Sequence, residues 1–266
     1  MRRGYLIPMI AVLGFAFLYA PIASLVVFSF NENRLVTVWS GFSTRWYAAL
    51  FNDSQIVDAA FLSLQIAAVS ASIATVLGTL AGVALARLGR FRGKTALTGM
   101  ASAPLVMPDV ITGLSLLLLF VSMEALIGWP AGRGFTTITI AHSTFCMAYV
   151  TVVIRARLSD MDNSLDEAAM DLGATPLRVF FDITLPIISP ALVSGWLLAF
   201  TLSLDDLVIS SFVSGPGAST LPMVIFSKIR LGVSPDVNAL ATIIIGIVAI
   251  GVIAATMIGM RRPQKT

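Results

Sequence analysis

The sequence has few of the residue types on which catalysis and covalent cross-linking usually depend. Its 266 residues contain one cysteine, Cys146, and one histidine, His142. One cysteine excludes an internal disulfide and leaves the redox compartment open. Because the single histidine lies inside an apolar run, no arrangement of nucleophile, base and oxyanion donors can be recognised. We therefore do not expect this chain to be an enzyme.

Charge is also scarce: charged residues make up 12% of the chain and hydrophobic residues 57%, with a mean hydropathy of +0.92. A soluble globular domain carries a clearly larger share of charge. Six apolar runs approach or exceed the roughly 20 residues that a helix needs to span a bilayer core. The sequence thus predicts an all-α integral membrane protein with six transmembrane helices, at about 5–30, 59–86, 96–124, 135–156, 187–213 and 237–260.

No ATP-hydrolysing domain fits in the short connections between these six spans. The stretch LGRFRGKT has three residues between Gly89 and Gly93, whereas a Walker motif has four between its glycines. It also follows a membrane span, where the motif requires a strand. Any use of ATP must therefore depend on a partner chain, and no cofactor is expected on this one.

The distribution of Lys and Arg predicts the orientation, because these residues are enriched in short cytoplasmic loops. Of the 17 basic residues, 12 fall on one side of the predicted spans and five on the other. Both termini and the 87–94 loop are therefore expected in the cytoplasm. The isoelectric point near 9.4 follows from these clusters and indicates topology and contact with anionic lipid, with no nucleic acid as partner. The 12 are Arg2, Arg3, Arg87, Arg90, Arg92, Lys94, Arg155, Arg157, Arg178, Arg261, Arg262 and Lys265.

Three aspartates within the predicted spans are candidates for a transport pathway. Asp205 and Asp206 are adjacent in the 187–213 span, where each costs on the order of 2.5–3.5 kcal/mol on insertion scales. Each either contacts a cationic ligand or is used structurally, by pairing with another subunit or capping a helix end. Asp109 follows Pro104 and Pro108 in a span expected to be kinked and to face a pore. It is either a pathway residue or a charge at a helix start.

His142 and Cys146 are four residues apart and would share one face of a helix, which is the geometry of a metal-ligand pair. No third ligand is near them in the sequence. We therefore interpret them as polar residues packed in the interior of a helix bundle, and no metal site is predicted.

The long polar stretch from Ser164 to Pro190, SLDEAAMDLGATPLRVFFDITLPIISP, is unlike the rest of the chain. Ser164 and Glu167 have the spacing of a capping box, so a helix should begin there. Gly173 is placed to end it in the left-handed conformation. Thr175 and Pro176 then predict a second helix start. The stretch predicts two short helices joined by a tight turn, suited to docking; an amphipathic loop on the membrane surface is the alternative.

The spacing of Glu167-Ala168-Ala169, Gly173, Ile183 and Leu185-Pro186 resembles the cytoplasmic loop of the membrane subunits of binding-protein-dependent ABC importers. In that family the loop inserts into a cleft on the ATP-hydrolysing subunit, and the resemblance implies the same here. It also implies one transmembrane domain over 1–266 with the type I importer permease (MetI-like) fold, a permease core at about 59–260 and a docking loop at 164–190.

The runs FTLSLDDLVISSFVSGPG, LVMPDVITGLSLL and GVSPDVNALAT resemble permeases of polyamine importers, in particular those for putrescine. The resemblance implies an inner-membrane complex with a sister permease, two ATP-binding subunits that hold ATP and Mg, and a periplasmic polyamine-binding protein. The implied solute is a polyamine, putrescine or spermidine. The same importer architecture with a different small solute is the main alternative; a secondary transporter and a membrane enzyme are two further ones. The outer segment 31–58 is expected to lie on the membrane surface, and the resemblance implies contact with the binding protein as a further use. For the outer segment 214–234 the resemblance implies a re-entrant segment, and a surface cap is the alternative.

Overall fold

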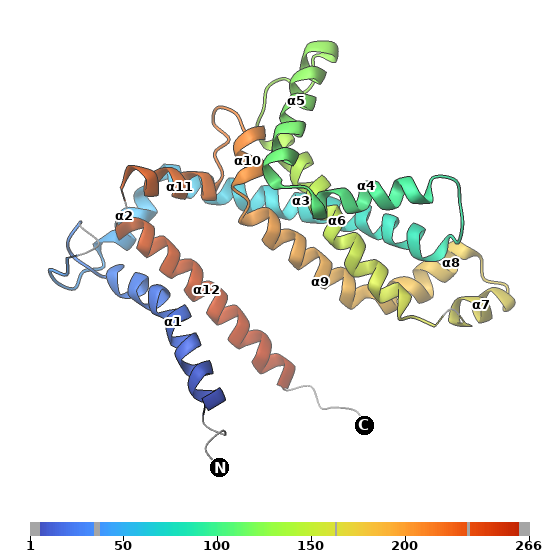
Figure 1. The fold of residues 1–266 in the computed structure, drawn as a ribbon, viewed down its shortest axis with the longest axis horizontal. Coiled ribbons are helices and arrows are strands. Elements are labelled where there is room, and N and C mark those ends of the chain that lie inside the picture. Colours follow the sequence, from blue (N-terminus) through green and yellow to red (C-terminus); the bar gives the residue numbers. More distant parts are fainter. Residues whose placement is uncertain (1–5, 35–37, 163, 233–234, 261–266) are drawn as a thin grey trace. The chain divides into compact units, whose positions relative to one another are not determined.

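The structure, a computed structural model, describes residues 6–34, 38–162, 164–232 and 235–260 (Figure 1). The predicted cytoplasmic termini, with Arg2, Arg3, Arg261, Arg262 and Lys265, lie outside these residues. All regular elements in the described part are helices, as the sequence predicts. They are α1 (Leu6–Phe28), α2 (Arg45–Asn52), α3 (Ser54–Arg87), α4 (Lys94–Val106), α5 (Asp109–Ile127), α6 (Phe135–Ser159), α7 (Ser164–Asp171), α8 (Pro176–Val179), the π-helical turn η1 (Phe180–Thr184), α9 (Leu185–Leu204), α10 (Val208–Val213), α11 (Leu221–Leu231) and α12 (Pro235–Met260).

Five stretches of helix in the described residues are long and apolar enough to cross a membrane. They are 7–28, 54–87, 109–127, 135–159 and 176–204, and a shorter apolar stretch, Pro235–Ile250, belongs to α12. These six stretches correspond to the six predicted spans. The second is longer than expected, because α3 begins at Ser54 and has 34 residues.

The expected third span, 96–124, is wrong as a single helix. It is divided into α4 and α5, and the break lies at Met107 and Pro108, both of which have extended backbone. A proline disfavours helical backbone in the residue before it and has no N–H to continue the helix. The prolines therefore predict the position of a kink correctly, but the result is a helix end and a new start at Asp109.

The chain divides into two compact units, one formed by residues 59–223 and the other by 1–58 with 224–266. In the first unit α6 is the most deeply buried span, with 67% of its most apolar window buried. It packs against α4, α9 and α10. Its core includes Ile138, Cys146, Val150 and Ile154, none of which has measurable exposure.

Gly78 and Gly82, which have GxxxG spacing, allow α3 to approach α6 closely. A Cβ atom at Gly78 would lie 2.7 Å from Cβ of Val150, and one at Gly82 would lie 3.0 Å from Cγ2 of Ile154. The first distance is too short for any side chain larger than hydrogen. Small residues at such positions let two membrane helices pack at the level of their backbones.

In the other unit, α12 packs against α1 and α2. The segment after α1 folds back on itself: Tyr47 and Ser29 are joined by a 2.7 Å hydroxyl–hydroxyl bond, and Trp46 Nε1 donates to the carbonyl of Asn31 at 2.7 Å. Phe30 stacks on Phe42. The aromatic residues of this outer segment thus form a small folded cluster, whereas its predicted position at the membrane interface stays a prediction.

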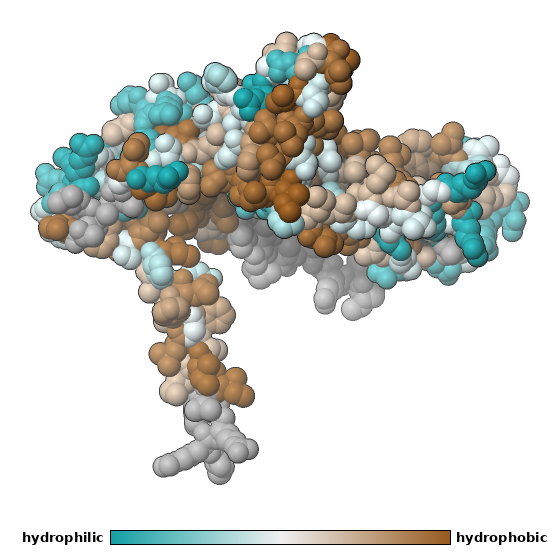
Figure 2. All heavy atoms as spheres, turned by 45° about the horizontal axis from the view of Figure 1, so that its top comes forward, coloured by the Kyte–Doolittle hydropathy of each residue, from teal (hydrophilic) through white to brown (hydrophobic). Residues whose placement is uncertain are grey.

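Apolar side chains cover much of α1 and α5 on their outer surfaces, as Figure 2 shows. Phe17 on α1 and Leu126 on α5 are each 84% exposed. Apolar surfaces of this extent are suited to lipid or to neighbouring membrane helices and would be costly in water.

Candidate functional site

The stretch 164–190, which we call the docking segment, forms the predicted pair of short helices. α7 ends in a Schellman motif, in which the N–H of Ala174 donates to the carbonyl of Ala169 at 3.0 Å and that of Gly173 to Met170 at 2.9 Å. Gly173 has a φ of +88°, in the left-handed region that glycine adopts without strain. The turn is therefore set by a local backbone requirement, as the sequence predicts.

The two helix starts differ in detail from the expected capping patterns. Ser164 is already the first residue of α7, and its N–H donates to Oδ1 of Asp162 at 2.9 Å. This bond lowers the pKa of the Asp162 carboxyl. Thr175 stands at the N-cap position of α8 with extended backbone, but its hydroxyl makes no capping hydrogen bond. Pro176 occupies the first turn, as expected, because it needs no N–H partner there.

The docking segment presents apolar side chains at its surface. α7 has no buried residue, and Leu172 and Leu177 are 90% and 72% exposed. Glu167, Ala168, Gly173 and Pro186 are also exposed, whereas Ala169, Ile183 and Leu185 are half-buried. The predicted docking residues thus share one short segment and most of them are accessible to a partner.

The docking segment continues without interruption into a membrane span. α8 leads into the π-helical turn Phe180–Thr184 and then into α9, and the backbone at Thr184 and Leu185 stays helical. Single π-helical turns inside α-helices are frequent at functional positions. The expected span from 187 therefore begins earlier, as part of a 29-residue helical stretch from Pro176 to Leu204.

The fifth span also ends earlier than predicted, and its two aspartates lie in a break between helices. α9 ends at Leu204, and α10 begins at Val208. Both carboxylate oxygens of Asp206 accept backbone N–H bonds from the first turn of α10, at 3.3 Å from Ile209 and 2.7 Å from Ser210. The expected continuous helix over 187–213 is wrong, because Asp206 starts a new helix as a cap does.

His142 holds Asp206 from the neighbouring helix α6. Its Nε2 lies 3.1 Å from Oδ2 of Asp206 and 3.0 Å from Oγ of Ser210, and its Nδ1 lies 2.7 Å from Oγ of Ser203. Side-chain exposure is 2% for His142 and 9% for Asp206. The network joins α6, α9 and α10, and the carboxylate of Asp206 is hydrogen-bonded within the chain.

Asp205 and Asp109 differ from Asp206 because both are exposed. Asp109 is the first residue of α5, and Asp205 lies shortly before α10. These two helices pack on each other: a Cβ at Gly113 of α5 would lie 2.7 Å from the ring of Phe212 on α10. The structure thus separates the three candidate pathway residues into one that is bound internally and two that are accessible.

Cys146 does not join His142 in a ligand pair. Its thiol donates to the carbonyl of Ala199 at 3.4 Å. The side chains of Cys146 and His142 are both buried. This agrees with the interpretation of the two residues as packed polar groups. Among the described residues, no group of three His, Cys, Asp or Glu side chains could hold a metal ion.

Sequence reasoning did not predict the contact between His142 and Asp206, which are 64 residues apart. The available signal was the cost of burying each of them: a single histidine in an apolar helix and an aspartate in another both require a polar partner.

Residues 74–262 match the family of binding-protein-dependent transport system inner membrane components. The chain belongs to this family, and it is a transport component rather than an enzyme. The match includes the docking segment and the helix break at Asp205 and Asp206.

Two curated relatives define the comparison more closely. The chain is 62% identical to the putrescine transport system permease protein PotI of Escherichia coli, over 96% of this chain and 92% of that protein. It is 48% identical to the spermidine/putrescine transport system permease protein PotC of Haemophilus influenzae, over 87% of each. Both relatives are permease subunits, in agreement with the resemblance seen in the sequence.

Solved structures of importers share the fold. A bacterial ABC transporter for the import of alginate matches with a TM-score of 0.75 and 18% identity, over 98% of this chain and 96% of that chain. The MetNI methionine transporter matches with a TM-score of 0.62 and 17% identity, over 75% and 92%. The fold is therefore that of type I ABC importer permeases.

Proposed function

We propose that this chain is the permease subunit of an ATP-driven importer of putrescine. The 62% identity to a putrescine permease over nearly the whole chain carries the proposal. The 48% identical relative is named for both spermidine and putrescine, so spermidine is the second candidate within the same class of polyamine cations. Another small solute is the remaining alternative.

The proposed complex contains a sister permease, two ATP-binding subunits that hold ATP and Mg, and a periplasmic polyamine-binding protein. The docking segment is the proposed contact with an ATP-binding subunit. Its exposed leucines, Leu172 and Leu177, offer apolar surface at the rim of a turn whose geometry is fixed by Gly173. Glu167, Ala168, Ala169, Ile183, Leu185 and Pro186 complete the proposed contact.

We assign the proposed pathway role to Asp205 and Asp109 and a supporting role to Asp206. A diamine cation needs accessible carboxylates, and the first two are exposed. Asp206 has its carboxylate occupied by two backbone donors and by His142. Its role is to hold the helix break that presents Asp205.

The proposed orientation places both termini, the α3–α4 loop and the docking segment in the cytoplasm. Arg87, Arg90, Arg92 and Lys94 support it, because they lie together between α3 and the start of α4.

Reconstituted complexes test the function. The chain, its sister permease and the ATP-binding subunits are placed in proteoliposomes, and ATP-dependent uptake of labelled putrescine is measured with the binding protein present, against spermidine and alginate oligomers. We expect ATP-dependent uptake of putrescine. Excess spermidine should reduce this uptake, and alginate oligomers should not. Absence of putrescine uptake by an assembled, ATP-hydrolysing complex refutes the proposed substrate.

Gly173→Val and Gly173→Asn form a matched pair for the docking role. A β-branched residue is strongly disfavoured at positive φ, whereas asparagine tolerates it, and no atom lies within 4 Å of a Cβ at this position. Gly173→Val should lose co-purifying ATP-binding subunit and uptake, while Gly173→Asn keeps both. Uptake at the wild-type rate by Gly173→Val contradicts docking through this turn.

A further inference from the structure

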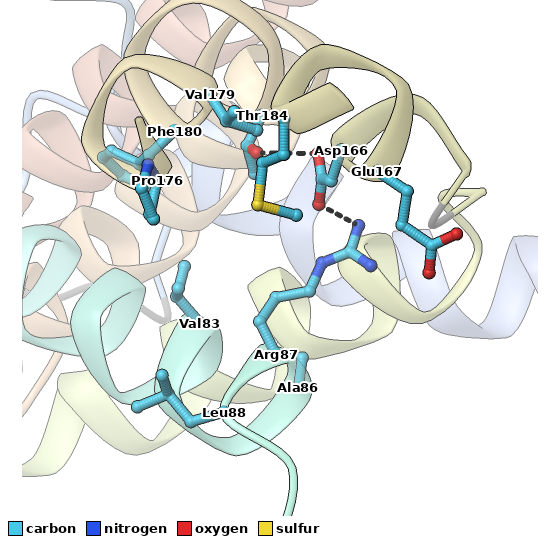
Figure 3. Close-up of a pocket in the computed structure, with 11 residues that line it drawn as sticks. Val83, Ala86, Arg87, Leu88, Asp166, Glu167, Pro176, Val179, Phe180 and Thr184 are labelled. Carbon is cyan, nitrogen blue, oxygen red and sulfur yellow. Dashed lines mark hydrogen bonds and ion pairs between the residues drawn. The ribbon is translucent and has the colours of Figure 1, made fainter. Parts of the chain in front are cut away.

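One carboxylate of the docking segment contacts two membrane spans at once. Oδ2 of Asp166 on α7 lies 3.5 Å from Nη2 of Arg87, the last residue of α3. The hydroxyl of Thr184, which immediately precedes α9, lies 3.4 Å from Oδ1 of the same carboxylate and is placed to donate to it. Figure 3 shows the three side chains converging from separate elements.

These contacts are shielded from water. The side chains of Arg87 and Asp166 are 18% and 17% exposed, and Thr184 is 4% exposed. By contrast, the ion pair between Arg178 and Asp182 in the same segment is 76% and 63% exposed. Exposed pairs contribute little, whereas loss of one partner of a shielded pair leaves a charge without compensation.

Asp166 is the only acidic residue within ion-pair distance of Arg87 in the described part of the chain. The Nε and Nη2 atoms of Arg87 are buried and have no hydrogen-bond partner there, so the contact with Asp166 is an ion pair without hydrogen-bond geometry. The two side chains line a cavity of about 430 Å³ together with Met170 and Phe180. Since α7 has no buried residue and borders this cavity, polar contacts take the place of close packing at this side of the helix.

We propose that Asp166 is a positioning residue that couples the docking helix α7 to the spans α3 and α9. Movement of α7 then changes the position of both spans, because each is attached to a different oxygen of one carboxylate. This inference rests on the proposed function, in which an ATP-binding subunit moves the docking segment.

The test uses the reconstituted complex with three single variants. Asp166→Asn removes the charge and keeps the size, Arg87→Gln removes the opposite charge, and Thr184→Val removes the hydroxyl and keeps the shape. The double variant Arg87→Asp with Asp166→Arg restores opposite charges in exchanged positions. Arg90→Gln is the matched control, because Arg90 is an exposed arginine three residues beyond Arg87.

Four quantities are measured: co-purifying ATP-binding subunit, basal ATP hydrolysis, its stimulation by the binding protein, and putrescine uptake per ATP hydrolysed. Asp166→Asn and Arg87→Gln should keep the first two and lower uptake per ATP by about fivefold or more, a typical size for coupling between sites. Thr184→Val should have a smaller effect in the same direction. The double variant should recover at least part of the loss, and Arg90→Gln should behave as wild type.

Uptake per ATP at the wild-type value in both charge variants overturns the inference. Loss of the ATP-binding subunit from these variants also overturns it, because Asp166 would then act in docking or folding. If Gly173→Val loses the ATP-binding subunit while Asp166→Asn couples normally, the inference fails and the proposed docking function remains supported.

Discussion

His142 Nε2 lies 3.1 Å from Oδ2 of Asp206, although the whole docking segment separates the two residues in the sequence. This contact fixes the helix break before α10. His142→Ala removes a hydrogen-bond partner from the Asp206 carboxylate and from the hydroxyls of Ser203 and Ser210, and loss of a partner by such buried polar groups costs about 1–3 kcal/mol. We expect a lower midpoint of thermal unfolding in detergent, measured by fluorescence-detected size-exclusion chromatography.

The control for this prediction is a double-mutant cycle. Asp206→Asn alone should also destabilise the protein, and the two changes together should cost less than the sum of the single costs, because they remove one shared interaction. Additive effects would contradict a direct contribution of the His142–Asp206 contact.

Asp205→Asn is expected to reduce putrescine uptake strongly without loss of stability. The side chain is exposed, so neutralising it should cost little stability. Uptake should fall while complex assembly and basal ATP hydrolysis remain normal. Asp109→Asn should act in the same direction. If both variants transport normally, the pathway role of these residues is wrong.

An ion-pair cluster stabilises the unit that contains α2 and α12. Lys228 Nζ lies 2.7 Å from Oδ2 of Asp53 and 3.0 Å from Oδ2 of Asp236. The hydrogen bond from Lys228 lowers the pKa of Asp53 below its usual value of 3.8. Burial alone would lower the pKa of Lys228, but its bonds to Asp53 and Asp236 outweigh burial and raise it above 10.5.

The stabilisation by this cluster is therefore expected at every pH between these limits. It is lost as the pH falls through the lowered pKa of Asp53 or rises through the raised pKa of Lys228. Since the side chains are partly exposed, Lys228→Met should cost about 1 kcal/mol or less. The difference in unfolding midpoint from wild type should be constant from pH 5 to about pH 9 and shrink below pH 3.8. A difference that grows on acidification would contradict this assignment.

The orientation is tested by thiol accessibility. Cys146 is buried, so the native protein should give little background with an impermeant maleimide. In intact cells, Arg34→Cys should be labelled from the periplasm and Arg92→Cys only after the membrane is permeabilised. Both positions are exposed in the structure. Labelling of Arg92→Cys from the periplasm would reverse the proposed topology; Gln264→Cys probes the C-terminal end, outside the described residues.

The features that the sequence predicts well are those decided by neighbouring residues. The turn at Gly173 and the helix start at Pro176 depend on backbone preferences within four or five residues, and both are found where the sequence places them. The membrane spans follow from long apolar runs. In these cases the local preference and the final structure agree, so no information about distant residues is needed.

The errors occur where a polar residue inside an apolar run starts a new helix. Asp206 lies one residue before the N-cap Leu207 and accepts from the first-turn N–H groups of Ile209 and Ser210, but the surrounding apolar residues made one continuous span the simpler prediction. The Arg87–Asp166 contact was not predictable at all, because it joins residues 79 positions apart on α3 and α7. Such contacts depend on how the helices pack, which a single sequence does not specify.

The π-helical turn Phe180–Thr184 joins α8 to α9 without a break in the helical backbone, so α8 and α9 can tilt together. The helical stretch from Pro176 to Leu204 has 29 residues and would be roughly 43 Å long at 1.5 Å per residue. A tilt of about 10° imposed near Pro176 would displace the other end of a rod of this length by roughly 7 Å. That other end is the helix break with Asp205 and Asp206. A small angular step at the docking segment is thereby sufficient to relocate the carboxylates by more than the width of a diamine cation.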